Sequence, residues 1–189
     1  PLRDASRLSR AALQCGVVIL GLALPFREVV TLGSANGVVV SAMVLTTLAS
    51  GLILLKLLRT DDVSGKLLTT GTAVCGGTAV ATLAPVIKAE NQQVAQTLTI
   101  LFVLNGIAIV LFPAIGHALD LSQQQFGMWA AVAIHDTSSV VGAAAAYGDE
   151  ALTTAATLKI LRILWLIPVI IIASYSMTVS YTHLTLPTR

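Results

Sequence analysis

Long apolar stretches separated by short polar breaks make up most of this chain. Each stretch is bounded by charges or by turn residues, such as Pro25 and the pair Asp61 and Asp62. The stretches are 11–25, 37–58, 67–87, 94–117, 126–147 and 151–175. Because a helix needs about 20 apolar residues to cross a hydrocarbon core, the pattern predicts an all-α polytopic transmembrane bundle with about six spans.

The loops between these stretches differ in their basic residues. If all six stretches cross, the loops 1–10, 56–66 and 117–125 share one side. That side carries Arg3, Arg7, Arg10, Lys56, Arg59 and Lys66. Cytoplasmic loops of membrane proteins carry an excess of Lys and Arg. We therefore expect this side, with the start of the chain, to face the cytoplasm.

The composition also indicates a membrane protein. Hydrophobic residues make up 56% of the chain and charged residues 11%, and the mean hydropathy is +0.87. A typical soluble domain has about a quarter of its residues charged. The net charge of +2 is too small to indicate binding to nucleic acid. The sequence has neither a phosphate-binding glycine loop with its lysine nor a zinc-ligand spacing of Cys and His, so we expect no cofactor, no metal and no enzyme activity.

The stretch 67–87 has an irregular composition for a helix. Gly71, Gly76 and Gly77 lie in its interior and Pro85 lies near its end. Glycine weakens a helix and proline removes a hydrogen-bond donor, so one interpretation is a broken or unwound helix. The other is close packing, because small residues let membrane helices approach one another. The residues of this stretch favour the two interpretations about equally.

Five consecutive polar residues interrupt the stretch 126–147: His135, Asp136, Thr137, Ser138 and Ser139. At about 1.5 Å per residue, Asp136 would lie roughly 15 Å deep in a hydrocarbon core about 30 Å thick. An ionisable side chain at that depth costs about 2.5 kcal/mol or more and must face the protein interior or water. We favour a substrate or ion site in which Asp136 or His135 changes protonation. The alternative is a hydrogen-bond cluster that only fixes helix packing.

Lys159 and Arg162 lie one helical turn apart in the stretch 151–175. If the span begins near Ala151, both side chains are deep and would pair with Asp136 or with an anion. If it begins near Lys159, both reach the membrane surface. The surface interpretation is slightly stronger, because the residues just before Lys159 are only weakly apolar.

Three further residues lie inside apolar stretches. Asn105 is an isolated polar residue that we expect to serve helix contacts. Cys15 and Cys75 are expected to be buried thiols and not a disulfide.

A nucleophile pair of Cys75 and His135 would make the protein an intramembrane enzyme, but no local motif supports it. A structural or regulatory membrane protein without transport activity is the other alternative.

Two runs of sequence carry a resemblance to a known family. They are TGTAVCGGTAVATLAPVIKAENQQVA and WAAVAIHDTSSVVGAAAAYGDEALTTAATLKILRILWLIPV. Both resemble the YeiH-type sulfate exporter family of bacterial inner-membrane proteins, and the resemblance covers residues 5–172. Members are longer than this chain, so we expect a fragment: residues 1–177 as a partial transporter domain and 178–189 as a non-native tail.

The resemblance implies a multi-pass secondary transporter of a small inorganic or organic anion, with inverted repeats and broken helices whose ends hold ions. The resemblance leaves open whether transport is coupled to protons and whether the protein forms a homo-oligomer. The expected partners are the lipid bilayer and the anion. His135 and Asp136 would be the protonatable pair, and Lys159 and Arg162 the counter-charges for Asp136 or for the anion. The implied neutral ligands are Thr137, Ser138 and Ser139, and the implied backbone lining is Cys75, Gly76, Gly77 and Thr78.

Overall fold

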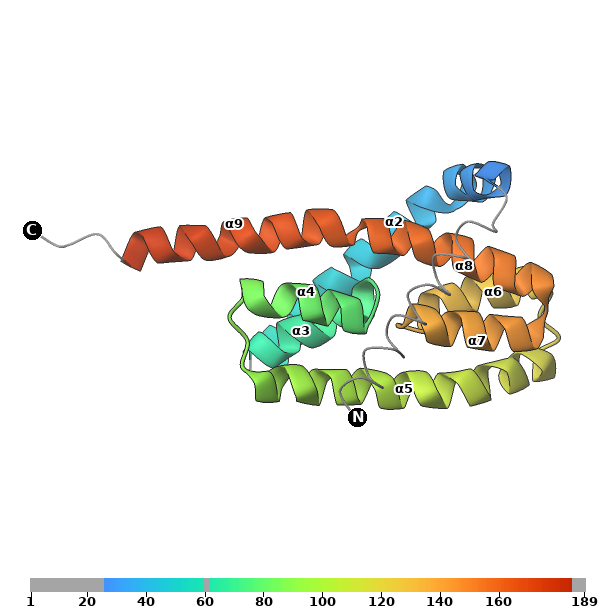
Figure 1. Cartoon of the computed structure of the whole chain (residues 1–189), viewed down its shortest axis with the longest axis horizontal. Coiled ribbons are helices and arrows are strands. Elements are labelled where there is room, and N and C mark those ends of the chain that lie inside the picture. The colour runs from blue at the N-terminus through green and yellow to red at the C-terminus, as the bar shows by residue number, and fades with distance from the viewer. Residues whose placement is uncertain (1–25, 60–61, 185–189) are drawn as a thin grey trace, which may run out of the picture.

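The regular structure of this protein is entirely helical in the residues that the computed structural model describes, 26–59 and 62–184. The expected all-α class is therefore confirmed for this part of the chain (Figure 1). The helices are α2 (Phe26–Leu58), α3 (Asp62–Ala73), α4 (Gly77–Val86), α5 (Asn91–Ala118), α6 (Gln123–Ala133), α7 (Thr137–Tyr147), α8 (Asp149–Leu164) and α9 (Leu166–Leu184).

Three helical stretches within the described residues are long and apolar enough to cross a membrane. They are Ser34–Leu58 in α2, Asn91–Ala118 in α5, and Asp149–Ser176, which joins α8 to α9. Their outward faces expose large aliphatic side chains such as Leu57 and Val110. Apolar residues on outward faces are typical of helices that contact lipid.

The stretch 67–87 forms a hairpin of α3 and α4 and does not cross. A Cβ built on Gly71 would lie 3.0 Å from Cγ2 of Val80. In one continuous helix these two residues would be about 13 Å apart. Leu67 likewise shares a core cluster with Leu83. The broken-helix interpretation is therefore confirmed. The expectation that 67–87 forms a single membrane span is wrong, because the chain turns back at its glycines.

The stretch 126–147 also folds back on itself, as the hairpin of α6 and α7. The rings of Phe126 and Tyr147 stack with their centroids 3.9 Å apart. A continuous helix would separate these residues by about 31 Å. The turn follows from the polar run, because Ile134 and Asp136 both have extended backbones and Asp136 starts α7 as its N-cap. This stretch is therefore not the expected span.

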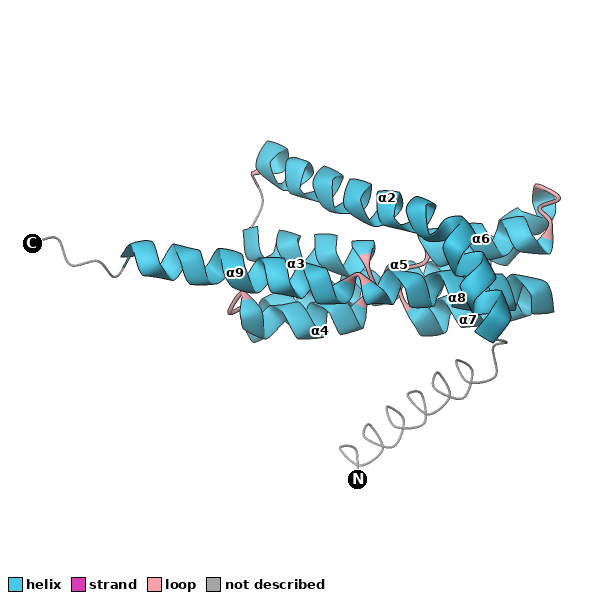
Figure 2. Cartoon of the chain, turned by 90° about the horizontal axis from the view of Figure 1, so that it is seen from above, coloured by secondary structure: helices cyan, strands magenta, loops and turns pink. Residues whose placement is uncertain are grey.

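The tips of the two hairpins meet near the middle of the molecule (Figures 1 and 2). A Cβ on Gly76, at the tip of the first hairpin, would lie 3.4 Å from the backbone of His135 and Asp136 at the tip of the second. The four hairpin helices have 10 to 12 residues each. Such helices are about 15–18 Å long, or roughly half a hydrocarbon core.

Because of the two hairpins, different loops share a side of the bundle than the sequence predicts. The end of α2, the start of α3 and the α4–α5 connection lie at one end of the bundle, and the α5–α6 and α7–α8 connections lie at the other (Figure 1). The expectation that 56–66 and 117–125 share a side is therefore wrong. The segment 117–125 contains no Lys or Arg, so the basic residues of 56–66 still mark one end. The expected span 11–25 lies outside the described residues.

Labelling of single cysteines will test this topology. In a background with Cys15 and Cys75 replaced by alanine, we expect Gln124→Cys and Asp149→Cys to react with a membrane-impermeant maleimide from the same face of sealed vesicles. Gln92→Cys, at the other end, should react only from the opposite face. Reaction of Gln124→Cys and Asp149→Cys from opposite faces would show that 126–147 crosses the membrane.

Candidate functional site

Two basic residues of α8 lie deep inside the protein, between the hairpins. Lys159 is 0% exposed and Arg162 is 5% exposed. Because α8 begins at Asp149, they lie about 15 and 20 Å along the helix from its start. The slightly preferred surface interpretation is therefore wrong. The Ala and Thr residues before Lys159 are weakly apolar because they pack against protein and not against lipid.

The guanidinium of Arg162 binds both hairpins. Its Nη1 atom donates to the carbonyl oxygens of Ala131 and Val132, at 2.7 and 2.8 Å. Its Nη2 atom donates to the carbonyl oxygens of Thr72 and Ala73, at 2.7 and 2.9 Å. These are carbonyls of the last turns of α6 and α3, which have no partner within their own helices. The positive charge also offsets the negative ends of two helix dipoles.

Lys159 completes the same arrangement at the second hairpin. Its Nζ atom donates to the carbonyl oxygens of Ile134 and His135, at 2.8 and 2.6 Å. These are the residues that directly follow α6. Neither Lys159 nor Arg162 forms an ion pair with Asp136 within the described residues. The expected pairing of Lys159 or Arg162 with Asp136 is therefore corrected, because backbone carbonyls take the hydrogen bonds of both cations.

Asp136 acts as the N-cap of α7. Its carboxylate accepts from the backbone amides of Ser138 and Ser139, at 3.0 and 3.3 Å, and from both of their hydroxyls. A side-chain oxygen in this position satisfies amides that lack a partner within the helix. The polar run therefore has a structural role, and it also brings a carboxylate and an imidazole to the hairpin tip. Thr137 is the first residue of α7 and is half-buried.

Asn105 of α5 holds the tip of the second hairpin in place. Its Oδ1 atom accepts from the amides of His135 and Asp136, at 3.0 and 3.4 Å. Sequence reasoning assigned Asn105 only to helix contacts, and the one available signal was its isolation within an apolar stretch. Asn105 Nδ2 and His135 Nδ1 are buried, and neither has a hydrogen-bond partner among the described residues. Buried polar atoms without a partner indicate a place for a solute or water.

The tip of the first hairpin contributes backbone and a thiol. Gly76 has φ 63° and ψ −122° and precedes α4, whose first turn has no side-chain cap. Cys75 is buried, and the amide of Ala79 lies near its sulfur. Gly77 packs toward α5, and the side chain of Thr78 is exposed. Of the four residues expected here, Gly76 makes the direct contact with the second hairpin.

A small cavity lies where the hairpin tips meet α2 and α8. Its volume is about 80 Å³, and its polar lining includes Thr47, Thr72, His135 and Arg162. At about 30 Å³ for each water molecule, it has room for two or three. The one charged side chain among the described residues that line it is the guanidinium of Arg162. The uncapped N-terminus of α4 adds a further partial positive charge nearby.

Comparison with known proteins finds many relatives of this chain. The family model "Conserved hypothetical protein 698" matches residues 5–185. The matched range thus includes part of 178–189, whose non-native origin stays a prediction. A UPF0324 membrane protein of Vibrio vulnificus is 46% identical over 89% of this chain and 54% of its own length. One from Shewanella oneidensis is 43% identical over 90% of this chain and 54% of its own length.

These matches cover only part of each relative. The chain spans about half the length of the curated relatives it matches, including a UPF0324 membrane protein of Bacteroides thetaiotaomicron that is 44% identical. No solved structure matches the chain.

Removal of Arg162 should destabilise the protein strongly. Arg162→Ala would leave four buried carbonyl oxygens without their donor, and each unsatisfied buried acceptor costs about 1–3 kcal/mol. We expect a loss of about 3 kcal/mol or more, measured as a lower midpoint of thermal unfolding in detergent. The matched control is Lys66→Ala, which removes an exposed ion pair with Asp62 worth less than about 1 kcal/mol. Equal midpoints for the two variants would contradict the role given to Arg162.

Gly76→Ala should also lower the unfolding midpoint, for a different reason. The backbone of Gly76 has a φ of 63°, a conformation that residues with a Cβ rarely adopt, at a position in contact with the second hairpin. Such a conformation costs a non-glycine residue about 1–3 kcal/mol. Gly142→Ala is the control, because a Cβ there meets nothing within 4 Å, and alanine favours a helix by about 0.5–1 kcal/mol. A Gly76→Ala variant as stable as Gly142→Ala would contradict the tip contact.

Proposed function

The chain belongs to the Conserved hypothetical protein 698 family of membrane proteins, as its resemblance to the YeiH-type proteins predicted, and we propose that it forms part of a secondary transporter for a small anion. The observation that carries this proposal is the burial of Lys159 and Arg162 at the meeting point of two hairpin tips. The proposal concerns the longer family proteins, of which this chain spans about half.

The architecture supports a solute site at mid-depth. Broken backbone inside a membrane is tolerated only where it is buried in protein or lines a wet cavity. Transporters use the ends of such half-helices to hold ions near the middle of the bilayer. Here four half-helix ends converge on one point, next to a cavity that contains an imidazole and a guanidinium.

The charge balance supports an anion over a cation. The C-terminal ends of α3 and α6 are matched by Arg162 and Lys159, and the N-terminal end of α7 is matched by Asp136. The N-terminal end of α4 has no matching side chain. An anion entering the cavity would therefore meet the guanidinium of Arg162 and the partial positive charge of that helix end. Sulfate, the solute that the family resemblance suggests, carries charge of the required sign.

Coupling to protons is supported by His135. It lines the cavity, and its Nδ1 atom has no partner among the described residues. An anion bound beside this imidazole would favour its protonated form, because a nearby negative charge stabilises the imidazolium. Asp136 lies next to it in the chain and is the second candidate to exchange a proton.

The location that fits this proposal is the bacterial inner membrane, crossed more than once. The segments 56–66 and 88–90 carry Lys56, Arg59, Lys66 and Lys88, whereas Arg27 is the one Lys or Arg near the opposite end within the described residues. By the excess of basic residues in cytoplasmic loops, we assign the end that contains Lys56 and Lys88 to the cytoplasm.

Flux measurements will test the proposal. We expect a full-length family protein that contains residues 26–176 of this sequence to carry labelled sulfate into proteoliposomes under an imposed pH gradient. Asp136→Asn should abolish the dependence on the gradient, because asparagine still caps a helix but cannot exchange a proton. Asp120→Asn is the matched control, since Asp120 is exposed at the end of α5, and it should behave like the unaltered protein.

Two results would count against the proposal. If folded protein carried none of a panel of small anions, the transport function would be wrong, and the polar cluster would serve helix packing alone. If Asp136→Asn left both flux and its pH dependence unchanged, the proton role of Asp136 would be wrong.

A further inference from the structure

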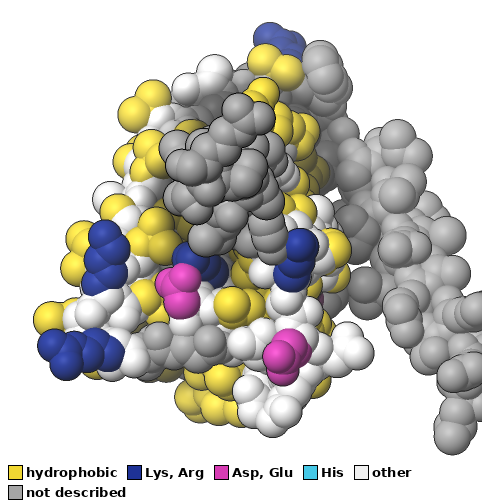
Figure 3. Space-filling view, turned by 90° about the vertical axis from the view of Figure 1, so that its left-hand side faces the viewer, with side chains coloured by type: hydrophobic (Ala, Val, Ile, Leu, Met, Phe, Trp, Pro, Cys, Tyr) yellow, Lys and Arg dark blue, Asp and Glu magenta, His cyan; other side chains and the backbone are white. Residues whose placement is uncertain are grey.

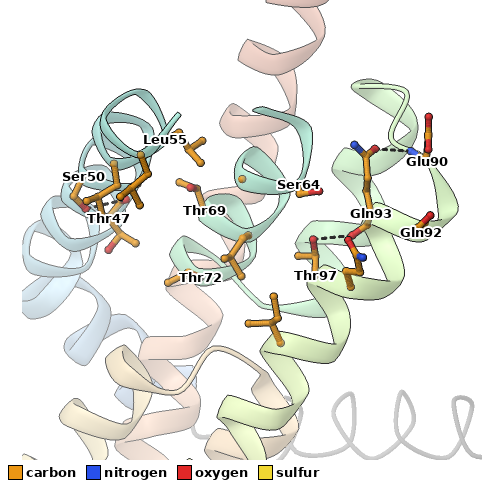
Figure 4. A pocket seen from close by; sticks show the side chains of 17 residues that line it. Thr47, Ser50, Leu55, Ser64, Thr69, Thr72, Glu90, Gln92, Gln93 and Thr97 are labelled. Atoms are coloured by element: carbon orange, nitrogen blue, oxygen red, sulfur yellow. Dashed lines mark hydrogen bonds between the residues drawn. The ribbon is translucent and has the colours of Figure 1, made fainter. Parts of the chain in front are cut away.

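A large cavity opens between α2, α3 and α5, at the end of the molecule assigned to the cytoplasm (Figure 4). Its volume is about 710 Å³. Ten of its 17 lining residues are Ser, Thr, Gln or Glu, and the remainder are Gly, Leu and Ile. None of the described residues that line it is Lys or Arg. Its walls are therefore uncharged, with polar side chains set in a mostly apolar surface and the single carboxylate of Glu90 near its mouth.

The polar lining is confined to one face of each helix. On α2, Thr47 and Ser50 face the cavity, whereas Leu45 on another face of the same helix is 51% exposed. On α5, Gln93 and Thr97 line the cavity. Polar groups placed against hydrocarbon are costly unless they are hydrogen-bonded or hydrated. The hydroxyls of Thr47, Ser50 and Thr97 donate to carbonyl oxygens of their own helices. Their oxygen atoms can still accept hydrogen bonds, so this row of side chains offers acceptors to water along the cavity.

The large cavity reaches the small cavity at the hairpin tips. Thr47 and Thr72 line both of them. Each lies about 15 Å from the end of its helix at the mouth of the large cavity, which is the depth of the middle of a bilayer. Beyond these two side chains lie His135 and Arg162. A separate cavity at the opposite end, lined by residues such as Arg27 and Asp149, shares no lining residue with the small one.

Basic residues surround the mouth of the large cavity. Figure 3 looks onto this end of the molecule and shows Lys and Arg side chains on it together with acidic ones. Lys56, Lys66 and Lys88 lie in the segments that form this end. Positive charge near an opening raises the local concentration of anions and their rate of entry.

We propose that the large cavity is a water-filled vestibule through which a small hydrated anion reaches the Arg162 cavity from the cytoplasmic end, with Thr47 and Thr72 forming the constriction between the two. This inference rests on the proposed anion transport. The neutral walls would let the anion pass while it is still hydrated, because the vestibule offers no cation to hold it. The first cation that the anion meets along this path is Arg162, after the constriction.

Cysteine labelling in the full-length family protein described above tests the vestibule. In a background without Cys15 and Cys75, Thr47→Cys and Thr72→Cys should react with a membrane-impermeant thiol reagent added at the cytoplasmic face. They should react at least about tenfold faster than Leu45→Cys, because the reactive thiolate forms only in contact with water. Ser50→Cys, closer to the mouth, should react at least as fast, and sulfate should slow the reaction at Thr72→Cys.

The possible results separate the two proposals. If Thr47→Cys, Ser50→Cys and Thr72→Cys are all as unreactive as Leu45→Cys, protein or lipid fills the cavity and the vestibule is wrong, whatever the flux assay shows. If they react fast only from the opposite face, the assigned direction of entry is wrong. If they react fast from the cytoplasmic face but no small anion slows Thr72→Cys, the water-filled path stands and the proposed anion transport fails.

Discussion

The hydrogen bonds of Arg162 are the constraint on which the rest of this structure depends. A hairpin that ends inside a membrane leaves carbonyl oxygens of its first helix without partners, and hydrocarbon offers no water to replace them. One guanidinium supplies donors to two such helices at once, through the carbonyls of Thr72 and Ala73 in α3 and of Ala131 and Val132 in α6. Neither hairpin could end where it does without a cation at this position.

The same constraint places the chemistry of the candidate site. Because Arg162 and Lys159 are three residues apart on α8, they lie on one face of the helix and bring the hairpin tips together. Gly76 permits that approach, because its backbone lies against the backbone of His135 and Asp136. Structural and functional requirements thus coincide: the groups that stabilise the helix ends are also those that could hold a charged solute.

The sequence allowed the helical class, the membrane location and the family to be predicted, and it left a break at the glycines of 67–87 as one of two equally favoured interpretations. It did not allow the two turns to be predicted, because a stretch of some 20 apolar residues has the same hydropathy whether it forms one span or two half-length helices. The stacking of Phe126 on Tyr147 that closes the second hairpin is a long-range contact with no local signal. The depth of Lys159 could not be predicted, because weakly apolar residues such as Ala155 and Thr157 indicate a membrane surface only where they face lipid, and both are buried in protein.

The position of Arg162 along the chain has a consequence for biosynthesis. Arg162 lies 90 residues after Thr72, whose carbonyl it binds. The ribosome therefore synthesises the first hairpin well before α8, the helix whose Arg162 donates to the carbonyl oxygens of that hairpin. The second hairpin also precedes α8 in the chain. Neither hairpin can complete its hydrogen bonds to Arg162 before α8 has been synthesised. The closing of the tips is thus a late event in membrane insertion, and its timing is set by the synthesis of α8.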